Sequence, residues 1–408
     1  MSVRRAQDER IEGTPDGLNA ITEIVDVPDA PTIGTATISS TTASVPFTAA
    51  VTGGAATSYT ATSTPGSITA TSASSPISVS GLSSGTSYTF KVKGTNSTAT
   101  GAESAASNSV TAVSPYGGYT AGGNGTAIEK LTFADESHST ISATLTTAAG
   151  SGGAMANSQT AGYYGGGYDT ARVSRIDKLT WPADTKSTLS ATLTEATFAL
   201  SGSANKGTAG YFASGNTATG GETRLSRIDK ITFSNDSKST LSATLSNGCN
   251  NTGNFANSGT AAYVAGGYTN GGNRSTIDKI TFSNDTCGAL GSSLSTQTRE
   301  LAGMANSGTA GYYGGGQTDG IGNLSRIDKI TFSNDSKSTL SGTLSTPRNN
   351  LGGIQNKGVA GYFVGGGDTE ALREYRKVTW TSDTVSLLSA QLSVGEGGLS
   401  GFSSESGL

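Results

Sequence analysis

Carboxylates are the side chains of this chain that come closest to catalytic chemistry, because they recur at fixed places in a repeated segment. One set is Glu129, Asp177, Asp229, Asp278 and Asp328, and a second is Glu136, Asp184, Asp236, Asp285, Asp335 and Asp383. A glycosidase uses two carboxyl groups about 5 to 10 Å apart whose pKa values differ. Acids copied once per repeat favour a structural role instead. The second set lies in turns, where a carboxylate can bond backbone amides, and the first can pair with an adjacent Lys or Arg. We therefore expect no catalytic residue, and a carbohydrate-active propeller enzyme is kept as an alternative.

Histidine and cysteine add little chemistry to these acids. His138 is the only histidine in the sequence, and it fills a repeat position that lysine fills in other copies. This position predicts a solvated side chain, and a Ser-His-Asp triad would have to use it. Cys249 and Cys287 are too few for a disulfide framework, so both are expected to be reduced and structural. Two cysteines without a nearby histidine do not predict a metal site, and we expect no cofactor.

The elements that carry these residues form a repeat of about fifty residues. Its central motif begins six times, at Ile128, Ile176, Ile228, Ile277, Ile327 and Tyr375. A period near fifty with several short strands per copy predicts the blades of a β-propeller. The first copy lacks a strand that the other copies have before the tyrosine patch, and residues 397–403 match that strand. The C-terminal strand is therefore expected to complete blade one and to close a six-bladed ring.

Glycine-rich patches accompany every copy. They cover residues 118–123, 162–167, 210–215, 262–267, 311–316 and 361–367. Glycine inside a strand predicts close backbone approach, here of inner strands that crowd a central channel. A phosphate-binding loop is not favoured, because no Gly-Lys-Ser or Gly-Lys-Thr follows these patches.

The repeats resemble known ones. In their spacing, their di- and triglycines and the tyrosine that follows, they are similar to Kelch-like repeats. Their motifs Gly-Tyr-Tyr-Gly-Gly-Gly and Ile-Asp-Lys-Ile-Thr-Phe resemble repeats in structural proteins of marine phages, including cyanophages. The resemblance covers about residues 116–408. It departs from eukaryotic Kelch proteins because only Trp181 and Trp380 occur, without a regular blade tryptophan. The resemblance implies the fold more directly than it implies a partner.

The preceding segment, residues 27–114, changes to a composition rich in Thr, Ser and Ala with almost no charge. Residues 81–92 resemble the fibronectin type III signature, in which Leu82 and Tyr88 would form a corner between late strands. Phe47 stands where that family usually has tryptophan. Such modules act as spacers, decorations or adhesive units, so the resemblance says little about function.

Residues 1–26 form a short charged arm that cannot build a core alone. We interpret it as a particle-docking arm that orders on other virion proteins, through Arg4, Arg5, Leu18, Ile21 and Ile24. A frayed terminus is the alternative interpretation.

Composition limits the partners. The formal charge is −4 and 14% of residues are charged, which gives no basic footprint for nucleic acid. The sequence shows neither an apolar signal segment nor a run of eighteen apolar residues, so neither export nor membrane insertion is predicted. A virion protein made in the host cytoplasm fits both observations.

Loops that differ between copies are the candidate binding surface, because stability needs repetition whereas asymmetric recognition needs difference. In an antiparallel four-stranded blade, the connections between second and third strands and those between blades share one face of the ring. Tyr and Arg provide rigid area and forked hydrogen bonds there, for host glycan or protein. The candidates are Tyr168, Arg172, Arg224, Tyr268, Arg274, Arg299 and Arg348. Drift in loops that touch nothing is the alternative.

The sequence therefore predicts an all-β chain: an arm at 1–26, a fibronectin type III-like sandwich at 27–114 and a six-bladed Kelch-like propeller at 115–408. As a function we predict a non-enzymatic phage virion protein in several copies per particle, a tail or neck appendage for host adsorption. A capsid decoration protein is the alternative placement.

Overall fold

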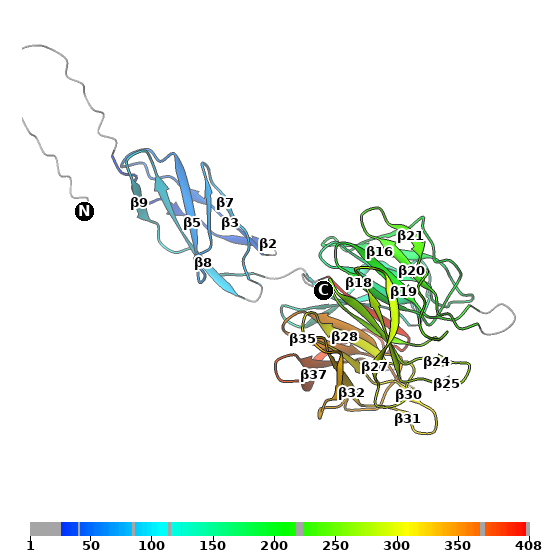
Figure 1. The fold of residues 1–408 in the computed structure, drawn as a ribbon. Coiled ribbons are helices and arrows are strands. Elements are labelled where there is room, and N and C mark those ends of the chain that lie inside the picture. The colour runs from blue at the N-terminus through cyan, green and yellow to red at the C-terminus, as the bar shows by residue number, and fades with distance from the viewer. Residues whose placement is uncertain are drawn as a thin grey trace, which may run out of the picture. The chain divides into compact units, whose positions relative to one another are not determined.

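The computed structural model describes residues 26–39, 41–83, 86–112, 116–123, 125–217, 223–367 and 372–404. The chain divides into two compact units, Met1–Val113 (unit 1) and Ser114–Leu408 (unit 2). Every regular element among the described residues is a β-strand, which confirms the all-β prediction (Figure 1). The described part of the chain holds no helix suited to crossing a membrane. The arm residues Arg4, Arg5, Leu18, Ile21 and Ile24 lie outside the described residues.

Unit 1 consists of short antiparallel sheets. Its strands are β1 (Thr32–Ile33), β2 (Thr37–Ser39), β3 (Thr42–Val45), β4 (Phe47–Thr48), β5 (Ser58–Thr64), β6 (Thr69–Ser72), β7 (Ile77–Val79), β8 (Ser87–Thr95), β9 (Thr100–Glu103) and β10 (Val110–Thr111). One sheet has the order β2-β3-β7, and another has the order β10-β8-β5-β6 with β9 also paired to β8. Buried and exposed residues alternate along β5 and β8, so each strand presents one face to a shared core and the other to solvent.

Local contacts in unit 1 agree with two sequence expectations. The N–H of Ser83 donates to the Tyr88 hydroxyl at 3.0 Å, and Leu82 and Tyr88 are both buried, as expected for the corner between strands. Phe47 is buried and its ring centroid lies 4.3 Å from that of Tyr59. A Phe–Tyr pair therefore fills the core at the position where tryptophan was expected from the resemblance.

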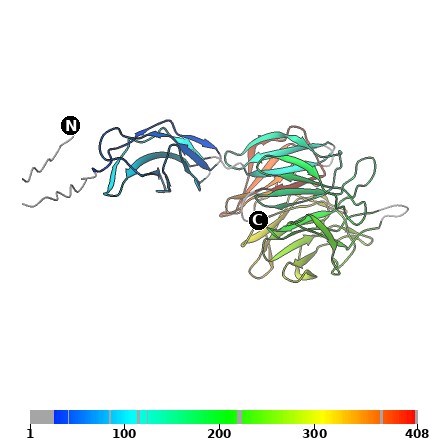
Figure 2. The same ribbon diagram turned by 90° about the horizontal axis from the view of Figure 1, so that it is seen from above.

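Unit 2 contains six four-stranded antiparallel sheets in its described residues. Figure 1 and Figure 2 show its strands from two directions. Sheet 1 has the order β38 (Leu399–Ser403), β11 (Gly117–Gly122), β12 (Ala127–Thr132), β13 (Ser137–Thr144). Sheet 2 runs β14 (Gly153–Asn157), β15 (Ala161–Gly165), β16 (Ile176–Thr180), β17 (Thr185–Thr188). Sheet 3 runs β18 (Ser201–Asn205), β19 (Ala209–Ala213), β20 (Ile228–Thr232), β21 (Ser237–Thr240).

The other three sheets repeat this plan. Sheet 4 runs β22 (Gly253–Asn257), β23 (Ala261–Ala265), β26 (Thr276–Thr281), β27 (Thr286–Ser293). Sheet 5 runs β28 (Ala302–Asn306), β29 (Ala310–Gly314), β32 (Ile327–Thr331), β33 (Ser336–Thr339). Sheet 6 runs β34 (Gly352–Asn356), β35 (Ala360–Val364), β36 (Glu374–Thr379), β37 (Thr384–Gln391). Two small hairpins extend sheets 4 and 5, β24 (Tyr268–Thr269) with β25 (Gly272–Asn273) and β30 (Gln317–Thr318) with β31 (Gly322–Asn323).

The last strand completes the first sheet, as the sequence predicts. β38 pairs antiparallel with β11, so that Gly118 lies opposite Ser403 and Gly122 lies opposite Leu399. The first strands of the six sheets also contact one another in a cycle, from β14 through β18, β22, β28, β34 and β38 back to β14. The chain therefore closes around a central channel lined by these six inner strands.

The first glycines of the tyrosine patches have a different role from the one predicted. They lie on the second strand of each sheet, where each leaves room for a large side chain from the inner strand of the preceding sheet. Gly118 faces Ile354, Gly162 faces Phe402, Gly210 faces Met155, Gly311 faces Phe255 and Gly361 faces Met304, and an added methyl would overlap each of them. Sheet 4 has Ala262 at this position, and the matching inner-strand residue of sheet 3 is the small Ser203. Side-chain volume therefore explains these glycines.

Close backbone approach occurs at later glycines of the patches and also on the inner strands. A Cβ on Gly166, Gly267 or Gly316 would lie within 3 Å of a backbone carbonyl oxygen. A Cβ on Gly202, Gly303, Gly353 or Gly401 would overlap the backbone of the neighbouring inner strand. The predicted close backbone approach therefore occurs within the patches, and the crowding around the channel itself involves the glycines of the inner strands.

Candidate binding face

The two ends of the sheets form two faces with different chemistry. The turns between first and second strands, such as 158–160 and 258–260, share one end, called here the turn face. The connections between second and third strands and those between sheets share the other end, called the varied face; they include 168–174, 216–217, 223–226, 268–276 and 317–325. Ser404 lies on the turn face, since its carbonyl accepts the N–H of Gln159 and its N–H donates to Gly117. The chain thus enters unit 2 on the turn face, opposite the varied face.

A cycle of backbone hydrogen bonds encloses the channel mouth on the varied face. Six residues precede the inner strands and all have positive φ: Ser151, Ala199, Asn251, Glu300, Asn350 and Gly398. Each N–H donates to the carbonyl of the equivalent residue in the preceding connection at 2.7–3.0 Å, and Ser151 donates to Gly398 to complete the cycle. The left-handed conformation is costly for five non-glycine residues, by about 1 kcal/mol each. Its recurrence shows that the closed hydrogen-bond cycle compensates that cost.

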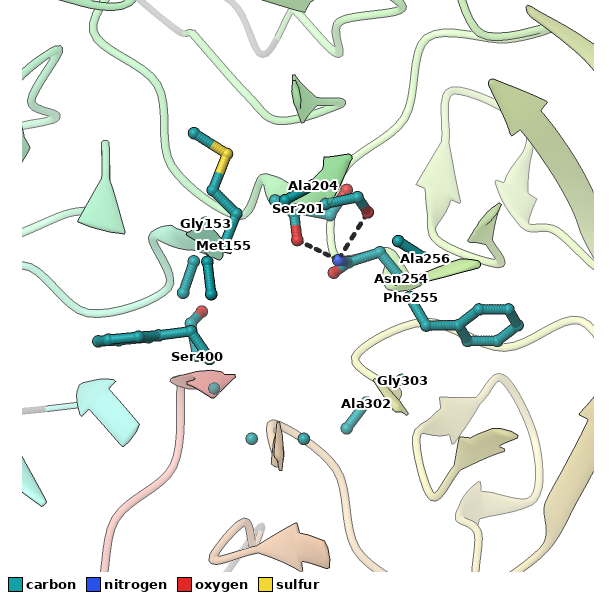
Figure 3. A pocket seen from close by; sticks show the side chains of 18 of the residues that line it. Gly153, Met155, Ser201, Ala204, Asn254, Phe255, Ala256, Ala302, Gly303 and Ser400 are labelled. Atoms are coloured by element: carbon teal, nitrogen blue, oxygen red, sulfur yellow. Dashed lines mark hydrogen bonds between the residues drawn. The ribbon is translucent and has the colours of Figure 1, made fainter. Parts of the chain in front are cut away.

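Small side chains line most of the channel. It encloses about 110 Å³, and Gly, Ala and Ser supply most of its lining. Figure 3 shows Met155 and Phe255 pointing away from it, between sheets, and Asn254 projecting into it. Asn254 donates to the Gly202 carbonyl and, at 3.0 Å, to the Ser203 hydroxyl. A polar side chain thus narrows the channel where the other inner strands carry Gly or Ala.

One carboxylate lies at the mouth on the varied face. This smaller cavity holds about 60 Å³, and Glu300 is the only acidic residue among its described lining residues. The Glu300 carboxylate accepts hydrogen bonds from the amides of Asn251 at 3.3 Å and Asn349 at 2.7 Å. A glycosidase needs a second carboxyl group across the bond to be cleaved, and these lining residues do not supply one.

The second set of carboxylates links neighbouring sheets, which corrects their predicted role in turn amide bonding. Each accepts a tyrosine hydroxyl at 2.7–2.9 Å and a lysine ammonium at 2.6–2.8 Å, both from the preceding sheet. The triads are Tyr119–Lys130–Asp184, Tyr163–Lys178–Asp236, Tyr211–Lys230–Asp285, Tyr263–Lys279–Asp335, Tyr312–Lys329–Asp383 and Tyr362–Lys377–Glu136. The turn N–H groups instead donate to the side chain of the residue before each acid. The N–H of Ser237, for example, donates to the Asn235 side-chain oxygen. The acids recur because every described junction uses one.

The first set also joins sheets, in addition to the predicted pairing with nearby arginine. Asp177 accepts the N–H and hydroxyl of Thr146 from sheet 1 at 2.8 Å, and Arg175 lies 3.5 Å away. Asp229 and Asp328 repeat both features. Burial alone would raise the pKa of Asp177, but the hydrogen bonds from Thr146 and Thr188 outweigh it and lower the pKa. Both sets are therefore engaged in structural contacts.

His138 is not the solvated residue that was predicted. Its Nε2 contacts the carboxylate of the buried Glu129, which also accepts hydrogen bonds from Thr140 and Ser393. Burial would raise the pKa of Glu129, but these three hydrogen bonds lower it below its usual value. Because Ser393 comes from the connection between sheets 6 and 1, the histidine supports the junction at which the ring closes.

Two of the predicted anchors, Arg274 and Arg348, are buried and bond to carboxylates and carbonyls of the chain itself. Arg274 is 6% exposed, and its Nη1 donates to Asp278 at 2.9 Å. Arg348 is fully buried and donates to Glu374 at 2.7 Å and to the Gly365 carbonyl at 3.3 Å. Neither guanidinium is available to a partner, because Arg274 is held by the buried Asp278 and Arg348 is itself fully buried. Loop variability alone could not distinguish these arginines from exposed ones.

Three predicted anchors come together on the varied face. The guanidinium carbons of Arg224 and Arg299 lie 4.6 and 5.2 Å from the centroid of the Tyr268 ring. Arg224 donates to Asn270 at 2.6 Å, and Arg299 donates to the exposed Asp319 at 2.7 Å. These contacts join loops of sheets 3, 4 and 5 into one surface, called here the Arg–Tyr cluster, with two ordered guanidinium groups.

Tyr168 and Arg172 form a second group with Phe198, a residue the sequence analysis did not select. Tyr168 is 49% exposed, and its ring centroid lies 5.8 Å from that of Phe198. The Arg172 guanidinium carbon lies 4.9 Å from the centroid of the Phe198 ring. Phe198 lies in the connection between sheets 2 and 3, on the face that the sequence analysis selected, so an aromatic residue in that connection was the available signal.

The cysteines are free thiols, Cys249 buried and Cys287 partly buried. Burial raises the pKa of Cys249 to about 11 and that of Cys287 to about 12, so neither forms a reactive thiolate at neutral pH. Among the residues that the structure describes, no group of three or more His, Cys, Asp or Glu is placed to hold a metal ion.

Comparison with known proteins gives a fold likeness alone. No family model matches the chain, and no curated protein matches it. Among solved structures, the one titled "Structure of YjhT" is similar, with a TM-score of 0.51, 16% sequence identity, and coverage of 61% of this chain and 86% of that chain. At this identity the likeness bears on the fold, which is β-propeller-like, and leaves the activity of this chain open.

Proposed function

We propose that this chain is a non-enzymatic phage virion structural protein, in which a fibronectin type III-like unit precedes a six-bladed Kelch-like propeller closed by β38. The propeller presents its varied face to the host surface, as part of a tail or neck appendage. The resemblance of the repeats to marine phage proteins supports the virion assignment, and the strand pairing of Gly118 with Ser403 supports the closed ring.

The observation that carries the binding role is the contrast between the two kinds of contact in unit 2. Links between sheets repeat at all six junctions and serve stability. The Arg–Tyr cluster, in contrast, joins loops of sheets 3, 4 and 5 alone, on the face opposite the chain entry. Rigid tyrosine and arginine side chains at one place are typical of binding hot spots.

Catalysis receives less support from the geometry. The mouth provides Glu300 as its one described acid, and both carboxylate oxygens of that residue accept amide hydrogen bonds. The repeated acids are held by tyrosine, lysine and threonine at the sheet junctions. Turnover of a polysaccharide that one carboxylate substitution abolishes would overturn the non-enzymatic assignment.

Cell binding by the full chain tests the function. Arg224→Ala and Tyr268→Ala are each expected to weaken binding to the phage's host cells about tenfold, with unchanged thermal unfolding. Leu387→Ala, at a residue 52% exposed on the outer strand β37, is the matched control. Equal binding by all four proteins would refute the role of the cluster.

Antibody labelling of intact particles tests the placement. Label at one end of the particle supports the appendage, whereas label over the shell would replace it with a capsid decoration. Deletion of residues 1–26 tests the arm separately: full incorporation of the shortened chain into particles would refute docking.

A further inference from the structure

We propose that Tyr168, backed by Phe198 and Arg172, is a stacking subsite for one pyranose ring of a host surface glycan; this inference rests on the proposed binding function. Tyr168 is 49% exposed, whereas the repeated tyrosines of the second strands are buried. Among the described residues, Tyr168 is the one exposed aromatic side chain, so its ring face is open to a ligand.

The ring of Tyr168 is held in position by neighbouring structure. Its N–H and carbonyl both pair with Gly150, at 2.9 and 3.0 Å, which fixes the backbone. The Phe198 ring packs against the Tyr168 ring with an interplanar angle of 56°. Phe198 is fixed in turn by backbone hydrogen bonds to Asn216 and by the Arg172 guanidinium over its ring. The subsite is therefore assembled from two connections and loses little side-chain entropy on binding.

The chemistry suits a sugar. The C–H groups of one pyranose face pack on an exposed aromatic ring, while hydroxyls at the sugar rim need polar partners. The Tyr168 hydroxyl, the Arg172 guanidinium and the exposed Asp169 carboxylate belong to the same loop, 168–172. This loop thus combines an apolar surface with donors and acceptors at its edge.

The surroundings favour a glycan over a protein partner. The exposed large apolar residues of unit 2, within its described residues, are Tyr168, Ile321, Val359, Leu387 and Val394, each from a different element. A stable protein interface needs about 800 Å² per partner with an apolar centre, and scattered single residues do not supply that centre. One sugar ring needs only the area of one aromatic side chain.

The Arg–Tyr cluster plays a different part. Tyr268 occupies the equivalent loop position in sheet 4, but two guanidinium groups lie over its ring and it is half-buried. Its ring is therefore less available for stacking than that of Tyr168. The structure assigns stacking to Tyr168 and leaves polar recognition to the Arg–Tyr cluster.

Binding of the full chain to an array of immobilised bacterial and eukaryotic glycans tests the subsite. We expect binding to pyranosides, at least tenfold weaker with Tyr168→Ala and Phe198→Ala and retained with Tyr168→Phe, because phenylalanine keeps the stacking surface. Leu387→Ala, at an equally exposed apolar residue, is expected to bind as the parent chain does. Absence of glycan binding, or glycan binding unaffected by Tyr168→Ala, would overturn the subsite.

Treatment of the host cells separates this inference from the proposed function. Periodate, which oxidises surface glycans, is expected to abolish cell binding, whereas protease treatment should leave it intact. Loss of binding after protease but not after periodate would overturn the glycan subsite and keep the adsorption role, with a protein as receptor. If the parent chain binds no untreated host cells, the proposed function itself fails, whatever the array shows.

Discussion

Closure of the ring by the last strand predicts that Phe402→Ala destabilises unit 2 strongly. Phe402 is 4% exposed, lies 5.6 Å from the Tyr119 ring and 6.3 Å from the Trp181 ring between centroids, and fills the space left by Gly162. Truncating a buried phenylalanine to alanine costs roughly 3–5 kcal/mol. In a unit of this size, each kcal/mol lowers the melting temperature by about 2–4 °C, so a decrease of roughly 6–20 °C is expected.

Tryptophan fluorescence during thermal unfolding measures this effect directly, because both tryptophans of the sequence, Trp181 and Trp380, lie in unit 2. Gly162→Ala provides the cross-check. Its added methyl would overlap Phe402, which costs roughly 1–3 kcal/mol in the parent chain but should cost much less in a Phe402→Ala background. An unchanged melting temperature for Phe402→Ala, or additive effects in the double variant, would refute closure by packing of β38 on sheet 2. Leu387→Ala serves as the exposed control and should shift the transition little.

Three further predictions concern charge and thiols. Asp285→Ala should lower the free energy of unfolding by roughly 1–3 kcal/mol, because it leaves Tyr211 and Lys230 of the preceding sheet without their acceptor. Unfolding in urea measures this loss of stability, and a midpoint equal to that of the parent chain would contradict the linking role. Hydrogen bonding lowers the folded-state pKa values of Glu129 and Asp177 below their unfolded values. The stability they contribute is therefore full above the unfolded pKa values and is lost as pH falls through the folded ones, so the melting temperature should begin to fall below about pH 4; a constant value down to pH 2.5 would argue against it. Cys249 and Cys287, with pKa values raised to about 11 and 12, should resist a disulfide reagent at pH 8 in the folded chain and react in guanidinium, and rapid labelling of the folded protein would show that burial is overestimated.

The sequence predicted the features that depend on repetition. A period near fifty residues indicated repeated sheets, and the missing first strand indicated the pairing of residues 399–403 with 118–122. The corner at Leu82 and Tyr88 was predictable because it depends on a short local spacing. The first set of acids was predicted to pair with nearby arginine, and Arg175 does lie beside Asp177.

Contacts between sheets were beyond local patterns, because their partners are distant in the sequence, 31 residues apart for Thr146 and Asp177 and 74 residues apart for Tyr211 and Asp285. The sequence placed Asp285 in a turn, but only the packing of sheet 3 on sheet 4 shows that it accepts the Tyr211 hydroxyl. His138 was misjudged for a different reason. The lysine at the same repeat position also lies beside an acid of the first set, as Lys186 lies 3.8 Å from Asp177, so this position faces a carboxylate rather than solvent alone.

The loop side chains show most clearly which features the sequence determined and which only the tertiary structure decided. The sequence by itself determined which face differs between copies, since variation in composition is visible residue by residue. Tertiary structure alone decided that Arg274 and Arg348 turn inward, that Arg224, Tyr268 and Arg299 meet, and that Tyr168 stays exposed beside Phe198. The physical reason is that burial of a long side chain depends on the carbonyls and carboxylates that neighbouring sheets bring within its reach, and these are set by the closed ring rather than by the loop that carries it.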